Sequence, residues 1–389
     1  MNTTNPHTMP TKPTRVAPAA PKAPVIKVLG LGGGGSNAVD RMLELGLRGV
    51  DFIVANTDQQ ALLRSDAARK IQLGPKLTRG LGAGGQPTVG REAAIESRHA
   101  LSEALQGCDM VFLTAGMGGG TGTGSIPIAA EIAKSQKIVT IAVVTTPFSF
   151  EMGRRQQNAM DGLKELQKHT DTLITIPNDR LLYVAPNDLP LETAFRLADD
   201  VLRQAVQSIT ELITEPGLIN VDFAHIRRVM QLGGGALMAI GHGSGENKAL
   251  KAVKQALDHP LLETVSLQRA AGVIANFTAS DELSLMEISE ALVYLQEQSN
   301  PDTEVIFGTT PKAHMEERVQ VNLVVTGLGA STLEEFMPGA ERIHQRPLPA
   351  RTQFSSSEKK QKPAYQMPSI TTTDLDIPAF LRRQSRYAG

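Results

Sequence analysis

The stretch that decides the fold of this 389-residue chain is Gly116-Met117-Gly118-Gly119-Gly120-Thr121-Gly122-Thr123-Gly124-Ser125. It follows an apolar run at 110–115 that is typical of a buried strand, and a helix is expected from Ser125. Its six glycines lose backbone entropy on ordering and pack nothing, so a turn alone hardly explains them. A series of backbone amides with two threonine hydroxyls can instead wrap the oxygens of a phosphate. The stretch therefore predicts a phosphate-binding loop between a strand and a helix.

Two further glycine-rich stretches, at 30–37 and 80–85, offer loops of the same kind. The first follows a strand expected at 25–29 and precedes a helix, whose N-terminal amides favour an anion. It matches the dinucleotide pattern G-x-G-x-x-G from Gly30 to Gly35, although that pattern alone is weak evidence. A tight turn without any ligand is the alternative interpretation of these glycines.

The surroundings of these loops bear on which nucleotide they would bind. A dinucleotide site needs an acid at the tip of the second strand, but the strand expected at 52–55 leads into Asn56-Thr57-Asp58. The P-loop pattern G-x-x-x-x-G-K-[ST] does not occur in the sequence. Three glycine-rich loops on one sheet favour a triphosphate. An oxidoreductase with a nicotinamide cofactor remains the alternative enzyme class.

The order of apolar runs predicts an α/β fold with a Rossmann-like parallel-sheet domain at 25–190, because strands and helices alternate there. Apolar residues at helical spacing predict one long central helix within 191–217, spanning 191–214. A smaller α+β C-terminal domain is expected at 218–330. The remaining segments are predicted to be a disordered N-terminal arm (1–24), a flexible linker (331–372) and a partner-binding tail peptide (373–389).

Composition excludes several classes of partner. A formal net charge of −1, with no Trp, gives no field or stacking surface for nucleic acid, so no nucleic-acid partner is expected. No apolar run reaches the length of about 20 residues that a membrane-spanning helix needs, so no membrane insertion is expected. The arm lacks the apolar centre of a signal peptide. Cys108, the single cysteine, fits a reducing cytosol and is interpreted as a packed thiol. The predicted location is cytoplasmic.

Residues 118–124 read Gly-Gly-Gly-Thr-Gly-Thr-Gly, the signature of the tubulin/FtsZ family. The chain resembles the bacterial cell-division GTPases of that family from about Val25 to Gly329 and again from Leu375 to Arg383. The resemblance implies a GTPase that binds GTP and GDP, with Mg²⁺ held through the phosphates, and that polymerises head-to-tail into a ring at the division site. The nucleotide contacts that it implies in and around the glycine-rich stretches are Gly33, Gly34, Gly35, Ser36, Asn37, Asn56, Ala83, Gly84, Gly85, Gly118, Gly119, Gly120, Thr121, Gly122, Thr123 and Gly124.

The same resemblance implies contacts to the sugar and base. Glu151 and Arg155 are expected to meet the ribose and phosphates, although their spacing also fits a simple surface ion pair. Asn178 and Asp199 are expected to face the base, with Phe195 stacked on it or packed in the core. Guanine presents two adjacent N–H donors that one carboxylate accepts together, whereas adenine presents an acceptor there. A carboxylate therefore selects GTP over ATP.

The segment after the long helix resembles the family's synergy loop. It supplies Asn220, Asp222 and His225 as candidate catalytic residues. The helix from Asp199 to Pro216 spans on the order of 25 Å, so Asp222 is expected to act on a neighbour's nucleotide in a head-to-tail contact. Asp222 would orient or activate water, and Asn220 would hold the loop or contact the phosphates.

His225 stands where the family usually has a second aspartate. A neutral imidazole can accept a proton but brings no negative charge to hold a cation. The substitution predicts GTP binding with slower hydrolysis. It also leaves open a weakly or non-hydrolysing GTP-bound scaffold, a regulatory copy tuned for long-lived polymer, or a histidine without a role.

The tail peptide carries acids before Pro378 and basic residues after its apolar anchors, which suits the dipole of a short helix. Such a peptide is too short to be stable alone and is expected to order in a partner's groove. The resemblance implies docking of membrane tethers and divisome proteins such as FtsA by Leu375 to Arg383, strengthened by avidity along a filament. A solvated tail is the alternative.

Overall fold

The computed structural model describes residues 23–328, apart from 152, 183–189, 216–220, 260, 263–266, 281, 314 and 316. Most of the predicted arm, and the whole of the predicted linker and tail peptide, lie outside the described residues. So does Asn220.

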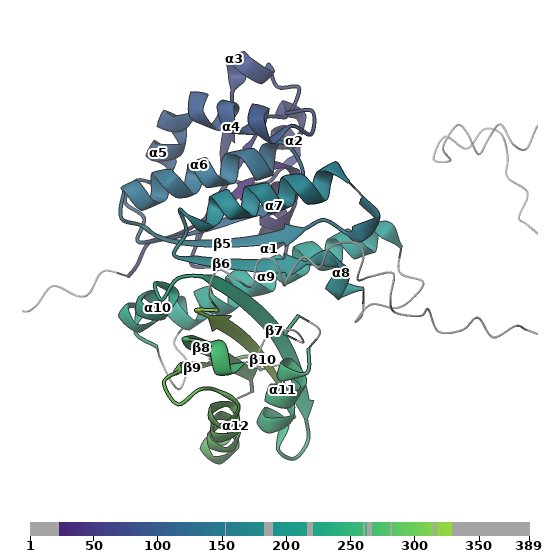
Figure 1. Cartoon of the computed structure of the whole chain (residues 1–389). Helices are drawn as coiled ribbons and strands as arrows, with labels where there is room; N and C mark the ends of the chain where they lie inside the picture. Colours follow the sequence, from purple (N-terminus) through teal and green to yellow (C-terminus); the bar gives the residue numbers. More distant parts are fainter. Residues whose placement is uncertain are drawn as a thin grey trace, which may run out of the picture. The chain divides into compact units, whose positions relative to one another are not determined.

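The described strands form one ten-stranded sheet in the order β3-β2-β1-β4-β5-β6-β7-β10-β8-β9 (Figure 1). Its first half is parallel, because each strand returns through a helical crossover. The strands at the centre of this half, β1, β4, β5 and β6, are rich in apolar and β-branched residues and are buried on both faces, whereas the edge strand β3 is mostly exposed. The parallel strands are β1 (Ile26–Leu31), β2 (Asp51–Asn56), β3 (Arg69–Gln72), β4 (Met110–Gly116), β5 (Val139–Thr146) and β6 (Thr172–Pro177).

The second half of the sheet is mixed. Strand β6 pairs with β7 in parallel through two residue pairs, Leu173–Gly235 and Ile174–Ala236. β10 then runs antiparallel to β7 and β8, and β8 pairs in parallel with β9. The bounds are β7 (Gly235–Ser244), β8 (Gly272–Ala279), β9 (Glu304–Pro311) and β10 (Arg318–Thr326).

Helices cover the parallel half on both faces. α1 and α9 share one core with β1, β2, β4, β5 and β6, and α4, α5, α6 and α7 close a second core on the opposite face (Figure 1). α11 and α12 cover one face of the second half of the sheet, and its other face joins the core of α9 and α10. The bounds are α1 (Gly32–Glu44), α2 (Gln59–Arg64), α3 (Pro75–Thr78), α4 (Pro87–Glu96), α5 (Arg98–Leu105), α6 (Thr121–Ser135), α7 (Arg154–Gln167), α8 (Asn178–Leu181), α9 (Leu191–Thr214), α10 (Phe223–Met230), α11 (Lys248–Leu257) and α12 (Leu285–Gln298).

The predicted fold class is confirmed, and α9 has the bounds that periodicity predicts. One local prediction is wrong. The helices begin inside the glycine-rich stretches, α1 at Gly32 and α6 at Thr121, rather than after them. The two helix starts touch: a Cβ on Gly32 would lie 2.6 Å from the backbone nitrogen of Gly122. Only glycine permits this approach, so these residues build two adjacent helix N-termini.

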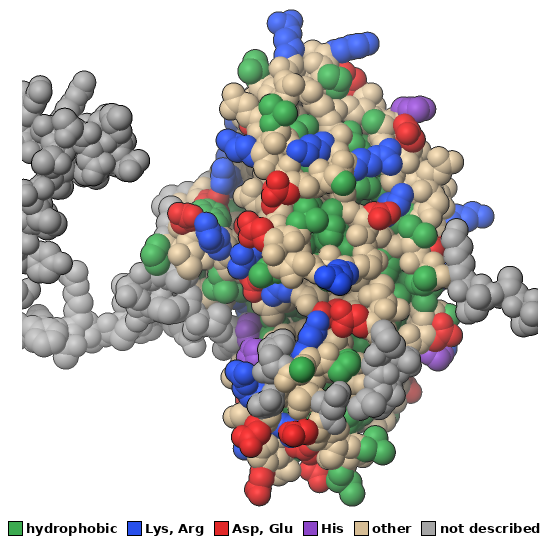
Figure 2. Space-filling view, turned by 180° about the vertical axis from the view of Figure 1, so that it is seen from behind, with side chains coloured by type: hydrophobic (Ala, Val, Ile, Leu, Met, Phe, Trp, Pro, Cys, Tyr) green, Lys and Arg blue, Asp and Glu red, His purple; other side chains and the backbone are tan. Residues whose placement is uncertain are grey.

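No described helix is long and apolar enough to cross a membrane. The face seen from behind carries basic and acidic side chains interspersed, with small hydrophobic patches between them (Figure 2).

Candidate functional site

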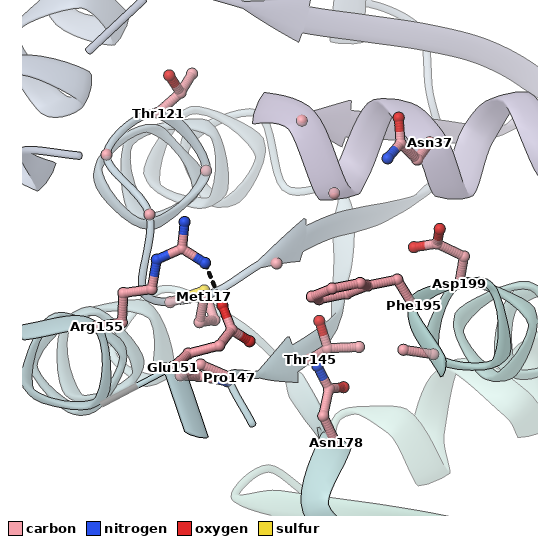
Figure 3. A pocket seen from close by; sticks show the side chains of 17 residues that line it. Asn37, Met117, Thr121, Thr145, Pro147, Glu151, Arg155, Asn178, Phe195 and Asp199 are labelled. Carbon is pink, nitrogen blue, oxygen red and sulfur yellow. Dashed lines mark hydrogen bonds and ion pairs between the residues drawn. The ribbon is translucent and has the colours of Figure 1, made fainter. Parts of the chain in front are cut away.

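A cavity of about 390 Å³ opens at the carboxyl ends of β4, β5 and β6 (Figure 3). Open parallel sheets place ligands at this edge. Its walls come from the first turns of α1 and α6, the starts of α7 and α8, and the N-terminal half of α9. The lining residues are Gly33, Gly34, Asn37, Gly116, Met117, Gly119, Gly120, Thr121, Gly122, Thr145, Pro147, Glu151, Arg155, Asn178, Phe195, Ala198 and Asp199.

One end of the cavity is built to receive an anion. The N-termini of α1 and α6 both reach it, and neither N-cap residue, Leu31 or Gly120, bonds the first turn with its side chain. Unpaired N–H groups at a helix start attract negative charge. A Cβ built on Gly33 or Gly119 would meet no atom within 4 Å, so the backbone there faces open space. A phosphate group fits such a surface.

Arg155 and Glu151 form an ion pair on the cavity wall (Figure 3). Glu151 also accepts a hydrogen bond of 3.0 Å from the Phe148 N–H, which fixes the turn that precedes α7. Arg155 is exposed, with N–H groups to spare beyond this pair. The ion pair that the spacing suggests is therefore present, and it lines the cavity. Contact of the two residues with the ribose and phosphates stays a prediction.

The opposite end presents an aromatic face and unpaired polar groups. Phe195 projects from α9 with 39% of its surface exposed and meets the Phe148 ring edge-on, with centroids 5.4 Å apart. The core interpretation of Phe195 is thus wrong, because the ring borders the cavity. Asn178 Oδ1 is buried and finds no hydrogen-bond partner among the residues that the structure describes. A ligand with a flat ring and polar edges would cover the ring and satisfy this oxygen.

Asp199 stands beside Phe195 and across from Asn37 (Figure 3). Burial raises the pKa of its carboxyl group to about 7, and the nearby positive charge of Arg41 opposes that rise. Within the described part of the chain, no donor is hydrogen-bonded to this carboxylate. Asp199 is therefore a partly buried acceptor that still lacks donors, which suits a base presenting two N–H groups.

Twelve of the predicted nucleotide residues line the cavity, and nine do not. Several of the nine support the lining instead: Thr123 Oγ1 accepts a 2.8 Å hydrogen bond from the Gly118 N–H, and Gly124 lies against the backbone of α4. Direct contact of the nine with a nucleotide stays a prediction. They are Gly35, Ser36, Asn56, Ala83, Gly84, Gly85, Gly118, Thr123 and Gly124.

Five lining residues were not predicted: Gly116, Met117, Thr145, Pro147 and Ala198. The carboxyl ends of the expected strands at 110–115 and 138–145 are the signal that could have found the first four. Ala198 lies one turn from Phe195 on α9, so helical spacing could have found it.

The predicted catalytic residues lie elsewhere. Asp222 is the N-cap of α10, where its Oδ1 accepts a 3.2 Å hydrogen bond from the Ala224 N–H, and His225 follows in the first turn. Neither side chain lines the cavity. α8, at the cavity, and α10 lie at opposite ends of α9 (Figure 1). From Asp199 to the end of α9 at Thr214 the helix rises about 22 Å.

Comparison with known proteins identifies the family. Residues 25–186 match the model of the tubulin/FtsZ family GTPase domain, and residues 234–329 match the FtsZ family C-terminal domain. A solved structure of FtsZ from M. jannaschii, an empty dimer, is 46% identical with a TM-score of 0.76, over 79% of this chain and 89% of that one. This chain belongs to the FtsZ family.

Other solved structures agree. A mutant of M. jannaschii FtsZ is 46% identical with a TM-score of 0.75, over 78% of this chain and 91% of that one. CetZ2 from Haloferax volcanii, solved as a GTPγS-bound protofilament, has a TM-score of 0.69 over 82% of this chain and 97% of that one. Its 18% identity indicates a shared fold only.

As a member of the FtsZ family the chain is a GTPase and binds guanine nucleotide. The alternative of a nicotinamide-dependent oxidoreductase is thereby set aside. The cavity fits the nucleotide, because it has two helix N-termini at one end and, at the other, a carboxylate and an amide oxygen that no described residue pairs. Among the residues that the structure describes, no three His, Cys, Asp or Glu side chains are grouped to hold a metal ion.

Proposed function

We propose that this chain polymerises head-to-tail in a GTP-dependent manner, forms the cytokinetic ring of cell division, and hydrolyses GTP where two subunits meet. The observation that carries the proposal is the separation of the cavity from Asp222 by most of α9. A contact between unlike surfaces that does not close on itself repeats as a filament. Such a contact would bring the Asp222 of one subunit to the cavity of the next.

The cavity residues divide the binding of GTP between them. The amides at the starts of α1 and α6, with the hydroxyl of Thr121, hold the phosphates. Arg155 and Glu151 border the ribose and phosphates. Phe195 stacks on the guanine, and the Asp199 carboxylate accepts its two adjacent N–H groups. Asn178 completes the recognition of the base.

Mg²⁺ would be bound through the phosphates of the nucleotide. When bound, the ion neutralises part of the phosphate charge. The chain's own contribution is to hold the phosphates on backbone amides and on the Thr121 hydroxyl.

Catalysis is completed by the neighbouring subunit. The Asp222 carboxylate orients the attacking water and accepts its proton. Asn220, which lies outside the described residues, would hold this loop or contact the phosphates. His225, in the first turn of α10, provides an imidazole in place of a second negative charge. A weakly hydrolysing or non-hydrolysing scaffold is the second candidate, favoured by that exposed histidine.

Phosphate release measured against protein concentration tests the proposal. The turnover per subunit is expected to rise once filaments form, as followed by light scattering and sedimentation. A non-hydrolysing scaffold would assemble with GTP and release no phosphate. Dilute monomer that cleaves GTP as fast as assembled protein would overturn the proposal.

Replacing His225 by Asp is expected to raise GTP turnover in filaments by about three- to tenfold, because a second negative charge near the phosphates helps to hold a cation. GDP affinity is expected to stay unchanged. The matched control is His225→Asn, which removes the imidazole without adding charge. If His225→Asp and the wild-type protein turn over GTP equally, the histidine is a neutral replacement.

GDP affinity is expected to fall as the pH drops below about 7, by about tenfold per unit, because Asp199 must be ionised to accept two N–H groups. The effect of Asp199 on the stability of the nucleotide-free protein has the opposite pH dependence. Its pKa is raised on folding, so its protonation favours the folded state as the pH falls from about 7 to 4. Calorimetric GDP titrations from pH 6 to 9 measure the effect, and residual binding to Asp199→Asn reports the phosphate's own titration. A flat profile would contradict the assignment of Asp199.

The tail peptide from Leu375 to Arg383, which lies outside the described residues, is proposed to dock membrane tethers and divisome proteins such as FtsA. A cytoplasmic location with a ring at the division site follows from this proposal. Deleting 373–389 is expected to abolish the recruitment of filaments to tether-bearing vesicles while GTP turnover in solution continues.

A further inference from the structure

Thr57, the residue that follows β2, is completely buried, and its hydroxyl touches a residue of the nucleotide cavity. Its exposed fraction is 0%, and its Oγ1 lies 2.6 Å from Thr121 Oγ1. Thr121 is the first residue of α6 and lines the cavity. Thr57 is therefore one hydrogen bond away from the end of the cavity that is built to receive an anion.

The glycine-rich stretch at 80–85 and the end of α3 hold Thr57 in place. The carbonyl oxygen of Thr57 accepts a 3.2 Å hydrogen bond from the Gly82 N–H and a 3.3 Å hydrogen bond from the Thr78 hydroxyl. Thr57 is thus bonded to this stretch through its backbone and to the start of α6 through its side chain. Its hydroxyl is already in place before any ligand binds, so binding does not have to order it.

The burial of Thr57 decides which of the two hydroxyls donates. A hydroxyl carries one hydrogen, and a buried O–H group that finds no acceptor costs free energy. Among the residues that the structure describes, Thr121 Oγ1 is the one hydrogen-bond partner of the Thr57 hydroxyl. If Thr121 donated to Thr57, the hydrogen of Thr57 would be buried without a partner. Thr57 is therefore the donor and Thr121 the acceptor.

Thr121 consequently keeps its own hydrogen for a ligand. Thr121 is half-buried in the cavity wall, and its hydroxyl has no other hydrogen-bond partner among the described residues. It stands at the start of α6, where unpaired helix amides also favour an anion. A hydroxyl that accepts one hydrogen bond donates a stronger one, because hydrogen bonds in a chain polarise each other. A phosphate oxygen is an acceptor of the kind that this hydroxyl needs.

We propose that Thr57 is a positioning residue for phosphate binding: it donates to Thr121 and thereby sets the Thr121 hydroxyl as a donor to a phosphate oxygen of the nucleotide. Thr57 itself is buried and does not touch the ligand. The inference rests on the proposed binding of phosphate by the Thr121 hydroxyl, and it adds the residue that fixes the direction of its hydrogen.

The test is the affinity for GTPγS, measured by calorimetry on the full chain at concentrations below assembly. GTPγS carries all three phosphates, so the phosphate that Thr121 meets is present in the probe. Thr57→Val replaces the hydroxyl by a methyl group of nearly the same size. It leaves the Thr121 hydrogen free to turn away from the phosphate, so the affinity is expected to fall by about three- to fivefold. Thr57→Ser keeps the donor and is expected to bind within about twofold of the wild-type protein.

The sign of the change for Thr57→Val tests the direction of the hydrogen bond. If Thr121 donated to Thr57 in the free protein, removing the Thr57 hydroxyl would release the Thr121 hydrogen for the phosphate, and the affinity would rise. An affinity that rises or stays at the wild-type value in Thr57→Val overturns the inference. Equal losses for Thr57→Ser and Thr57→Val also overturn it, because the donor would then not be what matters.

A double-mutant cycle tests whether the two threonines act as one unit. Thr121→Val alone is expected to weaken GTPγS binding by about tenfold. Adding Thr57→Val to Thr121→Val is expected to cost no further affinity, because the hydrogen that Thr57 directs is already gone. Losses that add would mean that Thr57 only supports the loop, and they overturn the inference. If Thr121→Val binds as the wild-type protein does, phosphate binding by Thr121 fails, and the inference fails with it.

Thr78→Val is the matched control, because it removes a buried hydroxyl that is bonded to the carbonyl oxygen of Thr57 and lies outside the hydroxyl pair. It is expected to lower the thermal midpoint while GTPγS affinity stays within about twofold of the wild-type value. A loss of affinity equal to that of Thr57→Val would reduce the effect to a loosened loop and overturn the inference. If Thr57→Val does not fold, Thr57→Cys decides, because a thiol is a weak donor. Thr57→Cys is expected to bind about threefold more weakly, and wild-type or higher affinity overturns the inference.

Discussion

Replacing Asp222 by Asn is expected to lower the GTP turnover of assembled protein by at least about 100-fold, because an amide cannot accept a proton from the attacking water. GDP affinity is expected to be unchanged, since Asp222 does not line the cavity and lies beyond the far end of α9. Asn is the informative replacement: Asp222 caps α10 through the Ala224 N–H, and Asn caps a helix as well as Asp does. Asp222→Ala would also lose about 1 kcal/mol of stability with the cap.

Mixing two variants with complementary defects separates action within a subunit from action between subunits. Asp222→Asn keeps its cavity, and a cavity variant such as Gly119→Ala keeps its Asp222. In an equal mixture, filaments are expected to recover about a quarter of wild-type turnover, since half of the subunits carry an intact cavity and half of their neighbours in the head-to-tail contact carry an intact Asp222. No recovery in filaments that contain both variants would contradict catalysis at the interface.

Two alanine substitutions in one glycine-rich stretch are expected to have opposite effects. Gly119 lines the cavity, and its added Cβ would meet no atom within 4 Å, so Gly119→Ala is expected to fold normally. Its methyl group faces the phosphate surface and is expected to weaken GDP binding by at least about tenfold, by keeping the phosphates from the amides. Calorimetry measures the loss. Wild-type affinity in this variant would contradict phosphate binding at the start of α6.

Gly124→Ala serves as the partner experiment. Its Cβ would lie 2.0 Å from the carbonyl oxygen of Pro87 and 2.6 Å from the amide nitrogen of Arg91, so α4 and α6 must separate. Such overpacking costs about 3 kcal/mol. We expect a fall in the thermal midpoint of several degrees for Gly124→Ala and none for Gly119→Ala. Equal midpoints would contradict the close crossing of the two helices.

The parts of the fold that depend on periodicity could be predicted from the sequence. α9 has an apolar stripe long enough to define both of its ends, and the apolar runs of β4, β5 and β6 are bounded by turn residues. The starts of α1 and α6 could not be predicted, because glycine is a poor helix former. Those helices begin at glycines and threonine because the two N-termini must approach each other and leave their amides free, which is a tertiary requirement.

The site residues could be predicted where the residue type suggests a single role, and less well where the same residue type serves either for binding or for packing. Asp199, Asn178 and Phe195 all line the cavity, and helical spacing alone had suggested a core position for Phe195. Gly124 and Gly119 look alike in the sequence, but one packs against α4 and the other faces the cavity.

The uninterrupted length of α9 has a geometric consequence for any insertion. A helix advances about 1.5 Å and turns about 100° per residue, so one added residue between Asp199 and Thr214 would swing α10 by more than a quarter turn relative to the cavity. Seven added residues restore the phase to within about 20° but lengthen the subunit by about 10 Å. Distance and angle are thus coupled in this helix. Evolution can alter the spacing between the two ends of the subunit only in whole turns.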